Sequence, residues 1–235
     1  MILSTSGVPR DDDLVLYFDP AIASSQYNGS ECFDLSGEAN DGELGDGSPT
    51  PSTNFGGTLV MDGLTDQVKF NHTTVSNTNG NWSISAFVRY SSLTNQNGHS
   101  TQQYITLGPF TSGGGLSVGK RSDGSHSCWG SGGNIMVNSG LTVGVDVWYN
   151  VAYTHSGGTH KIYVNGVLAA TNTATANSTT DTKVVMSGWR TPTSGMGSYK
   201  ENFEGDHGPF VVYNRVLNDE EVEQIFNTFR GRYGI

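Results

Sequence analysis

The stretch from Val147 to Thr171 reads VWYNVAYTHSGGTHKIYVNGVLAAT and decides the fold. Two segments rich in β-branched and aromatic residues, Val147–His155 and His160–Val164, flank a Ser-Gly-Gly turn. Asn165-Gly166 then precedes Val167–Thr171, and this dipeptide is favoured in a tight type I′ hairpin turn. The stretch therefore predicts three consecutive antiparallel strands.

Strand patterns recur through the rest of the chain, separated by Gly and Asn clusters. In Trp82–Tyr90 the even positions are mostly apolar and the odd ones mostly polar, which predicts a strand with one face in the core and the other in water. The segment from Asp19 to Gly57 is rich in turn residues and is expected to be mostly irregular. The further predicted strands are Leu14–Phe18, Thr58–Met61, Gln67–Phe70, Gln103–Leu107, Leu116–Lys120, Ile135–Asn138 and Asn202–Tyr213.

One helix is predicted, close to the end of the chain. Asn218 suits the N-cap position, and Glu221 lies three residues later, as a capping box requires. One face of this helix carries Val222, Ile225 and Phe226, and it should pack against the predicted strands. The tail from Phe229 to Ile235 is expected to be a strap on the surface.

Length and composition favour one all-β domain over residues 1–235, with residues 1–13 and 229–235 as terminal arms. Only 34% of the 235 residues are apolar and 32 are Gly, which suits short strands and turns. The formal net charge of −10 argues against nucleic acid as a partner. Cys32 and Cys128 are the two cysteines, and the sequence leaves open whether they pair or stay free.

No basic segment followed by an apolar run of signal length begins the chain, and no stretch approaches the roughly 18 apolar residues of a membrane span. Neither classical secretion nor a membrane span is therefore expected. Release by cell lysis is one route by which such a chain leaves its cell.

Two groups of motifs resemble the concanavalin A-like, laminin G-like jelly-roll family. A Trp-led strand, Trp148–Tyr153, is followed by a strand that runs into a Tyr-Val-Asn-Gly turn, Ile162–Gly166. The closing element of that family resembles Phe203–Gly205, then Tyr213–Leu217 and the acidic helix start Asp219–Glu221. The resemblance implies an antiparallel two-sheet β-sandwich, the concanavalin A-like jelly roll, with one short C-terminal helix.

A finer resemblance concerns the two ends of the chain. Leu16–Pro20, together with Phe226-Asn227 and Arg230–Ile235, is similar to laminin G-like structural proteins of tailed, especially marine, bacteriophages. This resemblance implies a location on the virion and other virion proteins of the capsid or tail as partners. Self-association into a homo-oligomer is left open.

The candidate ligand-binding residues follow from the chemistry of sugar sites, which use an aromatic platform with polar groups on loops. Trp129, in a glycine-rich segment expected to be a loop, and Trp189 with Arg190 are the candidates for a glycan site. Packing is an equally good interpretation of both tryptophans, whereas Trp82 and Trp148 lie in strand patterns and are predicted to be core.

Calcium is the candidate cofactor, because many members of the family bind it at the rim of the sandwich and hard cations prefer oxygen ligands. Asp19, Asp62 and Asp206 are the candidate ligands, with Asp34 and Asp41 beside similar motifs. Turn formation by these aspartates is an equally good interpretation.

The function predicted from these observations is a non-enzymatic virion surface protein, a decoration, fibre or adhesin module, that binds glycans or a host surface weakly through its loops. One alternative is a purely structural capsid or tail protein that binds no glycan. Another is a glycan hydrolase or lyase, for which Glu204 and Asp206 come nearest to the paired carboxylates of the glucanases, although the third carboxylate of that pattern is missing. No other common catalytic motif occurs, and the six His show no metal-ligand spacing.

Overall fold

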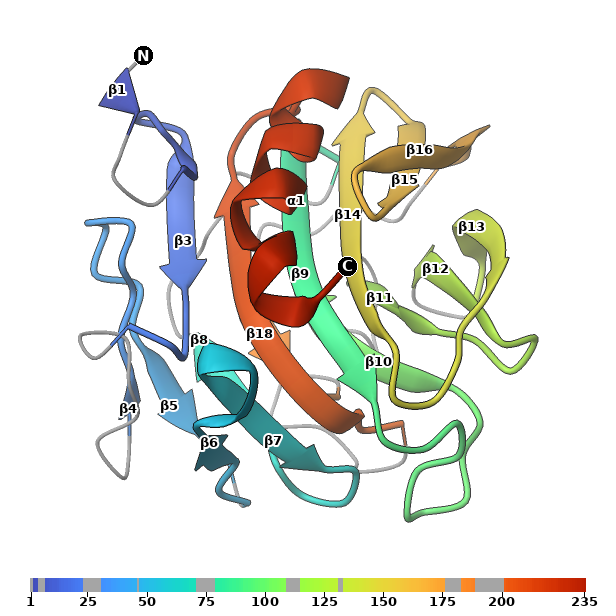
Figure 1. Cartoon of the computed structure of the whole chain (residues 1–235). Helices are drawn as coiled ribbons and strands as arrows, with labels where there is room; N and C mark the ends of the chain where they lie inside the picture. The colour runs from blue at the N-terminus through green and yellow to red at the C-terminus, as the bar shows by residue number, and fades with distance from the viewer. Residues whose placement is uncertain are drawn as a thin grey trace.

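The computed structural model describes residues 7–22, 31–45, 47–70, 79–108, 115–130, 133–175, 183–188 and 201–235, together with the backbone of residues 2–3. Strands dominate, and they form two large antiparallel sheets that pack face to face (Figure 1). A short pair, β1 (Ile2–Leu3) and β2 (Pro9–Arg10), lies near the N-terminus. The predicted all-β sandwich with one C-terminal helix is confirmed.

The first sheet has the strand order β16-β15-β14-β9-β18-β7-β6, and β3 also pairs with β18. The predicted three-strand unit forms as expected: β14 pairs with β15 from Val151↔Val164 to Ser156↔Thr159, and β15 pairs with β16 across the Asn165-Gly166 turn. The strand bounds in this sheet are β3 Leu14–Phe18, β6 Thr50–Ser52, β7 Thr58–Asp62, β9 Trp82–Tyr90, β14 Trp148–Ser156, β15 Thr159–Val164, β16 Val167–Thr173 and β18 Glu204–Tyr213.

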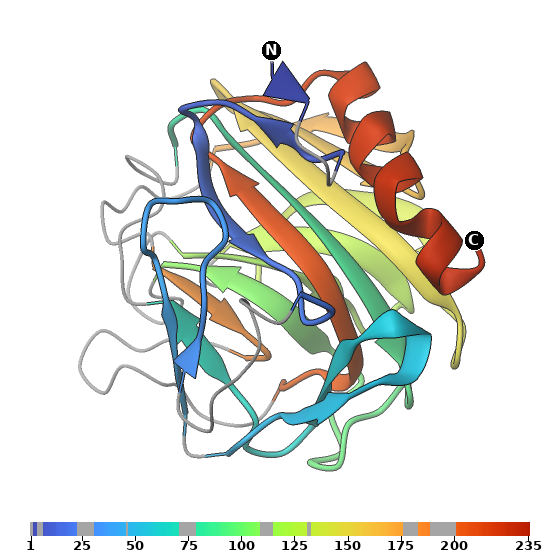
Figure 2. The same cartoon turned by 60° about the vertical axis from the view of Figure 1, so that its left-hand side comes forward.

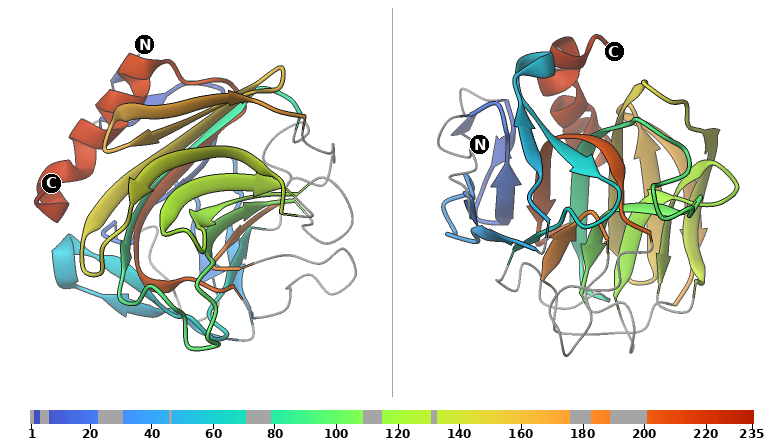
Figure 3. Two further views of the ribbon diagram at one scale, coloured as in Figure 1. Left: turned by 90° about the vertical axis from the view of Figure 1, so that its right-hand side faces the viewer. Right: turned by 90° about the horizontal axis from the view of Figure 1, so that it is seen from below.

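The second sheet has the order β13-β12-β11-β10-β17-β8-β5-β4. Figure 3 (left) shows this sheet lying on the side of the first sheet that faces away from the helix. The strand bounds are β4 Glu31–Cys32, β5 Gly42–Leu44, β8 Val68–Phe70, β10 Gln102–Leu107, β11 Leu116–Lys120, β12 Ser125–Gly130, β13 Ile135–Thr142 and β17 Val184–Met186.

The main core lies between the two sheets. It is formed by one alternate set of side chains from each strand, such as Ile84 and Val88 of β9 and Ile105 and Leu107 of β10. Trp82 is 1% exposed and belongs to this core, as predicted. Cys32 and Cys128 are free, buried thiols of the same core, and burial raises the pKa of each to about 12.

A second core lies between the first sheet and helix α1 (Asp219–Tyr233), which runs across the outer face of that sheet (Figure 2). The Asn218 side chain accepts from the Glu221 backbone N–H and the Glu221 side chain from the Asn218 N–H, so the predicted capping box is formed. The helix ends at Gly234, in the left-handed conformation that glycine adopts without strain.

Two predictions from the sequence were wrong because of the position and length of helix α1. The strand Trp82–Tyr90 is buried along both faces, because the face expected in water is covered by α1. The tail from Phe229 is not a surface strap, since the helix continues to Tyr233 and its ring lies 4.1 Å from that of Trp148. Trp148 is 3% exposed in this second core, which confirms its predicted packing role.

Two further predictions were incomplete. Within the described part of Asp19–Gly57, which was expected to be mostly irregular, the chain forms the short strands β4, β5 and β6. The glycine-rich stretch Ser127–Gly133 was expected to be a loop, but its first part, to Gly130, belongs to strand β12. No helix in the described ranges is long and apolar enough to cross a bilayer.

Candidate functional site: the outer row of the second sheet

A row of side chains crosses the outer face of the second sheet, on the side away from the core. Register pairs link its members in order: Lys69↔Val185, Val185↔Thr106, Thr106↔Ser117 and Ser117↔Trp129. Their chain neighbours point inward, since Val68, Val184, Ile105, Val118 and Cys128 all belong to the main core. We call Lys69, Val185, Thr106, Ser117 and Trp129 the outer row.

Polar contacts connect the middle of the outer row. The hydroxyl oxygens of Thr106 and Ser117 lie 3.0 Å apart. Thr106 donates to the carbonyl of Gly188 at 2.7 Å, and Ser117 donates to Oε1 of Gln103 at 3.0 Å. The amide nitrogen of Gln103 donates in turn to the Glu201 carboxylate. These side chains therefore form a buried polar network on a face of the sandwich that adds nothing to either hydrophobic core.

Two amides beside this network are incompletely hydrogen-bonded within the described ranges. Gln67 is fully buried, and in the described part of the chain neither Oε1 nor Nε2 of its side chain is hydrogen-bonded. Asn202 donates through Nδ2 to the Leu64 carbonyl, but its Oδ1 has no partner there either. Leaving a buried polar group unpaired costs about 1–3 kcal/mol, so these three atoms together destabilise the folded protein.

Gly188 explains how the two amides approach each other. A Cβ at this position would lie 2.3 Å from Nε2 of Gln67 and 2.5 Å from Oδ1 of Asn202. The φ of Gly188 is +113°, which residues with a side chain rarely adopt. Both amide groups therefore pack against Gly188, just past the end of β17.

Trp129 belongs to the outer row but is not the exposed loop platform that was predicted. It lies within β12, is 1% exposed, and its indole packs over Gly119, where a Cβ would come within 2.9 Å of the ring. The guanidinium of Arg121 lies 5.3 Å from the ring centroid. A sugar therefore cannot stack on Trp129 in this conformation. The other two predicted glycan residues, Trp189 and Arg190, lie outside the described residues.

The three candidate calcium ligands do not converge on one site. Asp19 is fully buried and binds the guanidinium of Arg232, whereas Asp206 binds Arg89 at 2.6 Å and accepts from Thr58 at 3.1 Å. Asp62 uses Oδ1 to accept the backbone N–H groups of the turn that follows it, at 2.7–3.1 Å. Within the described ranges no group of three acidic, His or Cys side chains is placed to hold a metal ion. Calcium binding stays a prediction.

Asp34 and Asp41 bind backbone N–H groups, and Asp34 forms the turn at Ser36 that the alternative interpretation predicts. Asp34 accepts from the backbone N–H groups of Tyr17, Ser36 and Asn40, and Asp41 accepts from the N–H of Asp34. Both carboxylates therefore stabilise the backbone around residues 34–41, and Asp34 also accepts from the more distant Tyr17.

An acidic corner does occur where Asp62 meets its neighbours. Burial and the nearby Asp62 charge raise the pKa of Asp66 to about 6. The same two causes, burial first, raise the pKa of Glu204. Asp66 also accepts from the backbone N–H of Asp62 at 3.0 Å, so the corner is closed by its own hydrogen bonds.

The two carboxylates closest to a glucanase pattern lie on the first sheet. Glu204 and Asp206 are two residues apart on β18, so they share one face of that strand. Asp206 faces Arg89, which places it on the helix-covered side rather than beside the outer row. Its ion pair with Arg89 and its bond to Thr58 occupy this carboxylate, which fits a structural role.

The sequence did not single out Gln67, Gln103, Thr106, Ser117 or Asn202. Thr106 and Ser117 are polar residues at alternate positions of apolar strands, which is a signal for an outward face. No local pattern shows that the Gln67 amide is unpaired, because this depends on tertiary neighbours.

A family model described as "Concanavalin A-like lectin/glucanases superfamily" (Laminin_G_3) matches residues 62–223. The chain belongs to this superfamily. No curated protein sequence matches this chain.

Solved structures show how widely this superfamily fold is shared. Domain 4 of AbnA, an extracellular arabinanase of Geobacillus stearothermophilus solved in complex with arabinotriose, superposes with a TM-score of 0.69 at 16% identity, covering 91% of this chain and 98% of that chain. The binding domain of Paraclostridial Mosquitocidal Protein 1 gives 0.68 at 17% identity, with 93% and 52% covered. The sialidase of Trypanosoma rangeli gives 0.67 at 16% identity, and this chain matches only 34% of it.

Proposed function

We propose that this domain binds carbohydrate without cleaving it, and that its ligand is recognised beside the outer row of the second sheet. The observation that carries the proposal is the pair of buried, incompletely bonded amides of Gln67 and Asn202. An amide offers donors and acceptors on one rigid plane, which suits neighbouring sugar hydroxyls that both donate and accept. A ligand that bonded these atoms would recover the cost of burying them unpaired.

The superfamily gives independent support. The arabinanase domain that was solved with arabinotriose has the same architecture over nearly its full length, so a domain of this size and shape is able to bind an oligosaccharide. Gln67, Asn202 and Trp129 are buried, and the ligand therefore reaches them only after a local rearrangement. Such a rearrangement lowers the apparent affinity, which fits the weak binding predicted from the sequence.

Binding is favoured over hydrolysis because the described carboxylates nearest to a catalytic pattern lie elsewhere. Asp206 is committed to Arg89 and Thr58, and it belongs to the helix-covered side of the first sheet. Retaining glycosidases need two carboxyl groups about 5 Å apart flanking the bond that is cleaved. The hydrolase alternative would be supported if the wild type released reducing sugar from a polysaccharide and the Glu204→Gln variant did not.

A location on the virion of a tailed phage is the second part of the proposal, and it rests on the resemblance of the two chain ends. The residues of those ends meet, since Asp19 of the first motif pairs with Arg232 of the last. Immunogold labelling of purified particles that encode this chain tests the location, and label only on unassembled protein would contradict it.

A glycan array that includes arabino-oligosaccharides, run with matched variants, tests the binding proposal. The Gln67→Leu variant removes both unpaired amide atoms at nearly constant volume and should lose the glycan signal while remaining folded. Gln96→Leu makes the same chemical change at an exposed residue and should bind like the wild type. If the wild type binds no glycan, or if Gln67→Leu binds as well as Gln96→Leu, the amides of Gln67 and Asn202 beside the outer row are not a sugar site.

A further inference from the structure

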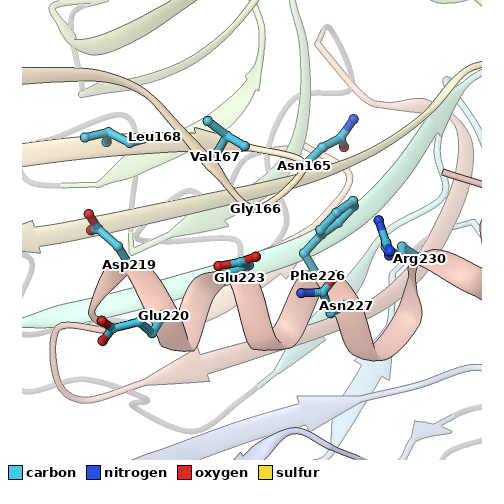
Figure 4. A pocket seen from close by; sticks show the side chains of 10 residues that line it. All are labelled: Asn165, Gly166, Val167, Leu168, Asp219, Glu220, Glu223, Phe226, Asn227 and Arg230. Carbon is cyan, nitrogen blue, oxygen red and sulfur yellow. The ribbon is translucent and has the colours of Figure 1, made fainter.

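A groove lies between the β15–β16 hairpin and helix α1 (Figure 4). Strands β15 and β16 belong to the first sheet, whereas the outer row lies on the second. Its volume is about 400 Å³. Gly166 opens the groove, because a Cβ there would come within 2.9 Å of the Phe226 ring. The lining residues are Asn165, Gly166, Val167, Leu168, Asp219, Glu220, Glu223, Phe226, Asn227 and Arg230.

One wall of the groove is an exposed apolar strand edge. Val167 is 69% exposed and Leu168 is 40% exposed, and both belong to β16, the last strand of the first sheet. No described strand of that sheet pairs with the outer edge of β16. Toward the end of β16, Asn172 donates to the Met136 carbonyl of β13, so the open part of the edge is its start, at Val167 and Leu168. Proteins usually protect such edges with charge, proline or a covering element, because an open edge is a template for another strand.

The other wall carries unpaired negative charge. Glu220 and Glu223 are exposed and form no ion pair with any described residue, whereas Asp219 bonds Lys161 at 3.3 Å and the Tyr163 hydroxyl at 2.8 Å. In Figure 4 these carboxylates line the part of the groove beside Val167 and Leu168. Arg230, over the Phe226 ring at 5.6 Å, lies toward the other end.

Helix stability accounts for only part of this charge. Acidic residues in the first turn offset the helix dipole, which explains Asp219 and Glu220. The effect fades beyond the first turn, so it gives little reason for Glu223. It also gives no reason for the apolar strand edge that faces these carboxylates.

We propose that this groove docks an extended, lysine- or arginine-bearing segment of another protein, which adds a strand to β16 and turns its cationic side chains toward Glu220 and Glu223. Edge pairing supplies backbone hydrogen bonds, and alternate side chains supply specificity. A second copy of the chain is a poorer occupant, because pairing β16 with β16 would bring two acidic grooves together in a protein of net charge −10. This inference is independent of the carbohydrate proposal.

The test uses fluorescently labelled peptides of alternating lysine and valine, with alternating glutamate and valine as the charge control. Fluorescence anisotropy should show saturable binding of the lysine peptide to the full chain and none of the glutamate peptide. The double variant Glu220→Lys/Glu223→Lys should weaken binding about tenfold or more, and added salt should weaken wild-type binding. Amide hydrogen exchange should slow in Val167–Thr173 when the lysine peptide is bound.

The matched control is Glu38→Lys/Glu43→Lys, which makes the same change in net charge near the far edge of the second sheet. This variant should retain most of the affinity, so that a loss confined to the Glu220/Glu223 pair identifies the groove. Equal weakening by both double variants, equal binding of both peptides, or no binding of the lysine peptide would overturn the proposal. Concentration-dependent dimers that protect β16 would assign the edge to a second copy instead.

Discussion

Arg232 binds both carboxylate oxygens of Asp19, at 2.7 and 2.8 Å, across 213 residues of sequence. Asp19 follows β3 and is fully buried, and Arg232 lies in the last turn of α1. The pair therefore fastens the helix to the strand that the N-terminal part of the chain contributes to the first sheet. A residue proposed as a calcium ligand thus has a structural partner of its own.

Breaking this pair should be costly. Removing one partner of a buried ion pair typically costs about 3–5 kcal/mol, and the partial exposure of Arg232 places Asp19→Asn toward the lower end. Urea unfolding measures the loss. Lys161→Ala removes the exposed pair with Asp219 and should cost less than about 1 kcal/mol. A loss in Asp19→Asn no larger than that in Lys161→Ala would contradict the structural role.

The same Gln→Leu substitution should lower the free energy of unfolding at one fully buried glutamine but not at another. Gln67 has no hydrogen-bond partner among the described residues, so Gln67→Leu should leave the free energy of unfolding unchanged or raise it by about 1 kcal/mol. Gln102 donates to the Ser92 carbonyl and accepts from the Glu204 N–H, so Gln102→Leu should lower the free energy of unfolding by about 1–3 kcal/mol. Thermal melts of both variants decide the matter, and similar destabilisation of the two would show that Gln67 is bonded in solution.

Two glycine-to-alanine substitutions should change the free energy of unfolding in opposite directions. A Cβ on Gly119 would lie 2.1 Å from the Gln102 carbonyl oxygen and 2.9 Å from the Trp129 ring, so Gly119→Ala should destabilise by about 1–3 kcal/mol. Nothing lies within 4 Å of the corresponding position on Gly231, inside α1. Gly231→Ala should therefore raise the free energy of unfolding by up to about 1 kcal/mol. Denaturant titration of both variants checks the signs, and tolerance of Gly119→Ala would place Trp129 elsewhere.

Acid should destabilise the fold through buried histidines. Burial, with Lys120 nearby, lowers the pKa of His126 to about 3, and burial lowers that of His207 to about 4. Below the ordinary value near 6.5 the unfolded chain binds protons that the folded chain does not. The stabilisation is therefore complete above about pH 6.5 and is lost toward pH 4, at up to about 1.4 kcal/mol per pH unit for each residue.

His126→Phe tests this pH dependence, because His126 packs among the rings of Tyr90, Tyr104 and Tyr149. The variant should lose about 2 kcal/mol less than the wild type between pH 6.5 and 4.5, as measured by urea unfolding. Asp66 acts in the opposite sense, since its pKa raised to about 6 makes protonation favour the folded state in the same range. An unchanged pH slope in His126→Phe would assign the acid sensitivity to other groups.

Much of the fold was predictable because its local signals agree. Apolar and polar residues mostly alternate in Trp82–Tyr90, Asn165-Gly166 specifies its turn, and Asn218 with Glu221 specifies the helix start. The strand Ser125–Gly130 was missed because its sequence, SHSCWG, combines small and polar residues with a glycine end. Its Cys128 faces the core while its Trp129 faces outward, and only the neighbouring strands show this.

The candidate site was far less predictable than the fold. Asp19, Asp62 and Asp206 were predicted as ligands because they are acidic residues beside motifs of the family. Asp19 and Asp206 instead bind the distant residues Arg232 and Arg89, and Asp62 binds the turn that follows it. Whether the Gln67 amide finds a hydrogen-bond partner depends on its tertiary neighbours, and it has none among the described residues. The sequence around Gln67 is that of an ordinary strand start. Hydrogen-bond satisfaction in a core cannot be read from local periodicity.

The most direct test of the carbohydrate proposal is an NMR titration that follows side-chain amide signals while an oligosaccharide selected on the glycan array is added. The account predicts that the NH₂ signals of Gln67 and Asn202 shift with a common saturation curve, while that of Gln102 stays in place. Saturable binding that leaves the signals of Gln67 and Asn202 unmoved would contradict the assignment of these two amides, beside the outer row, as the carbohydrate site.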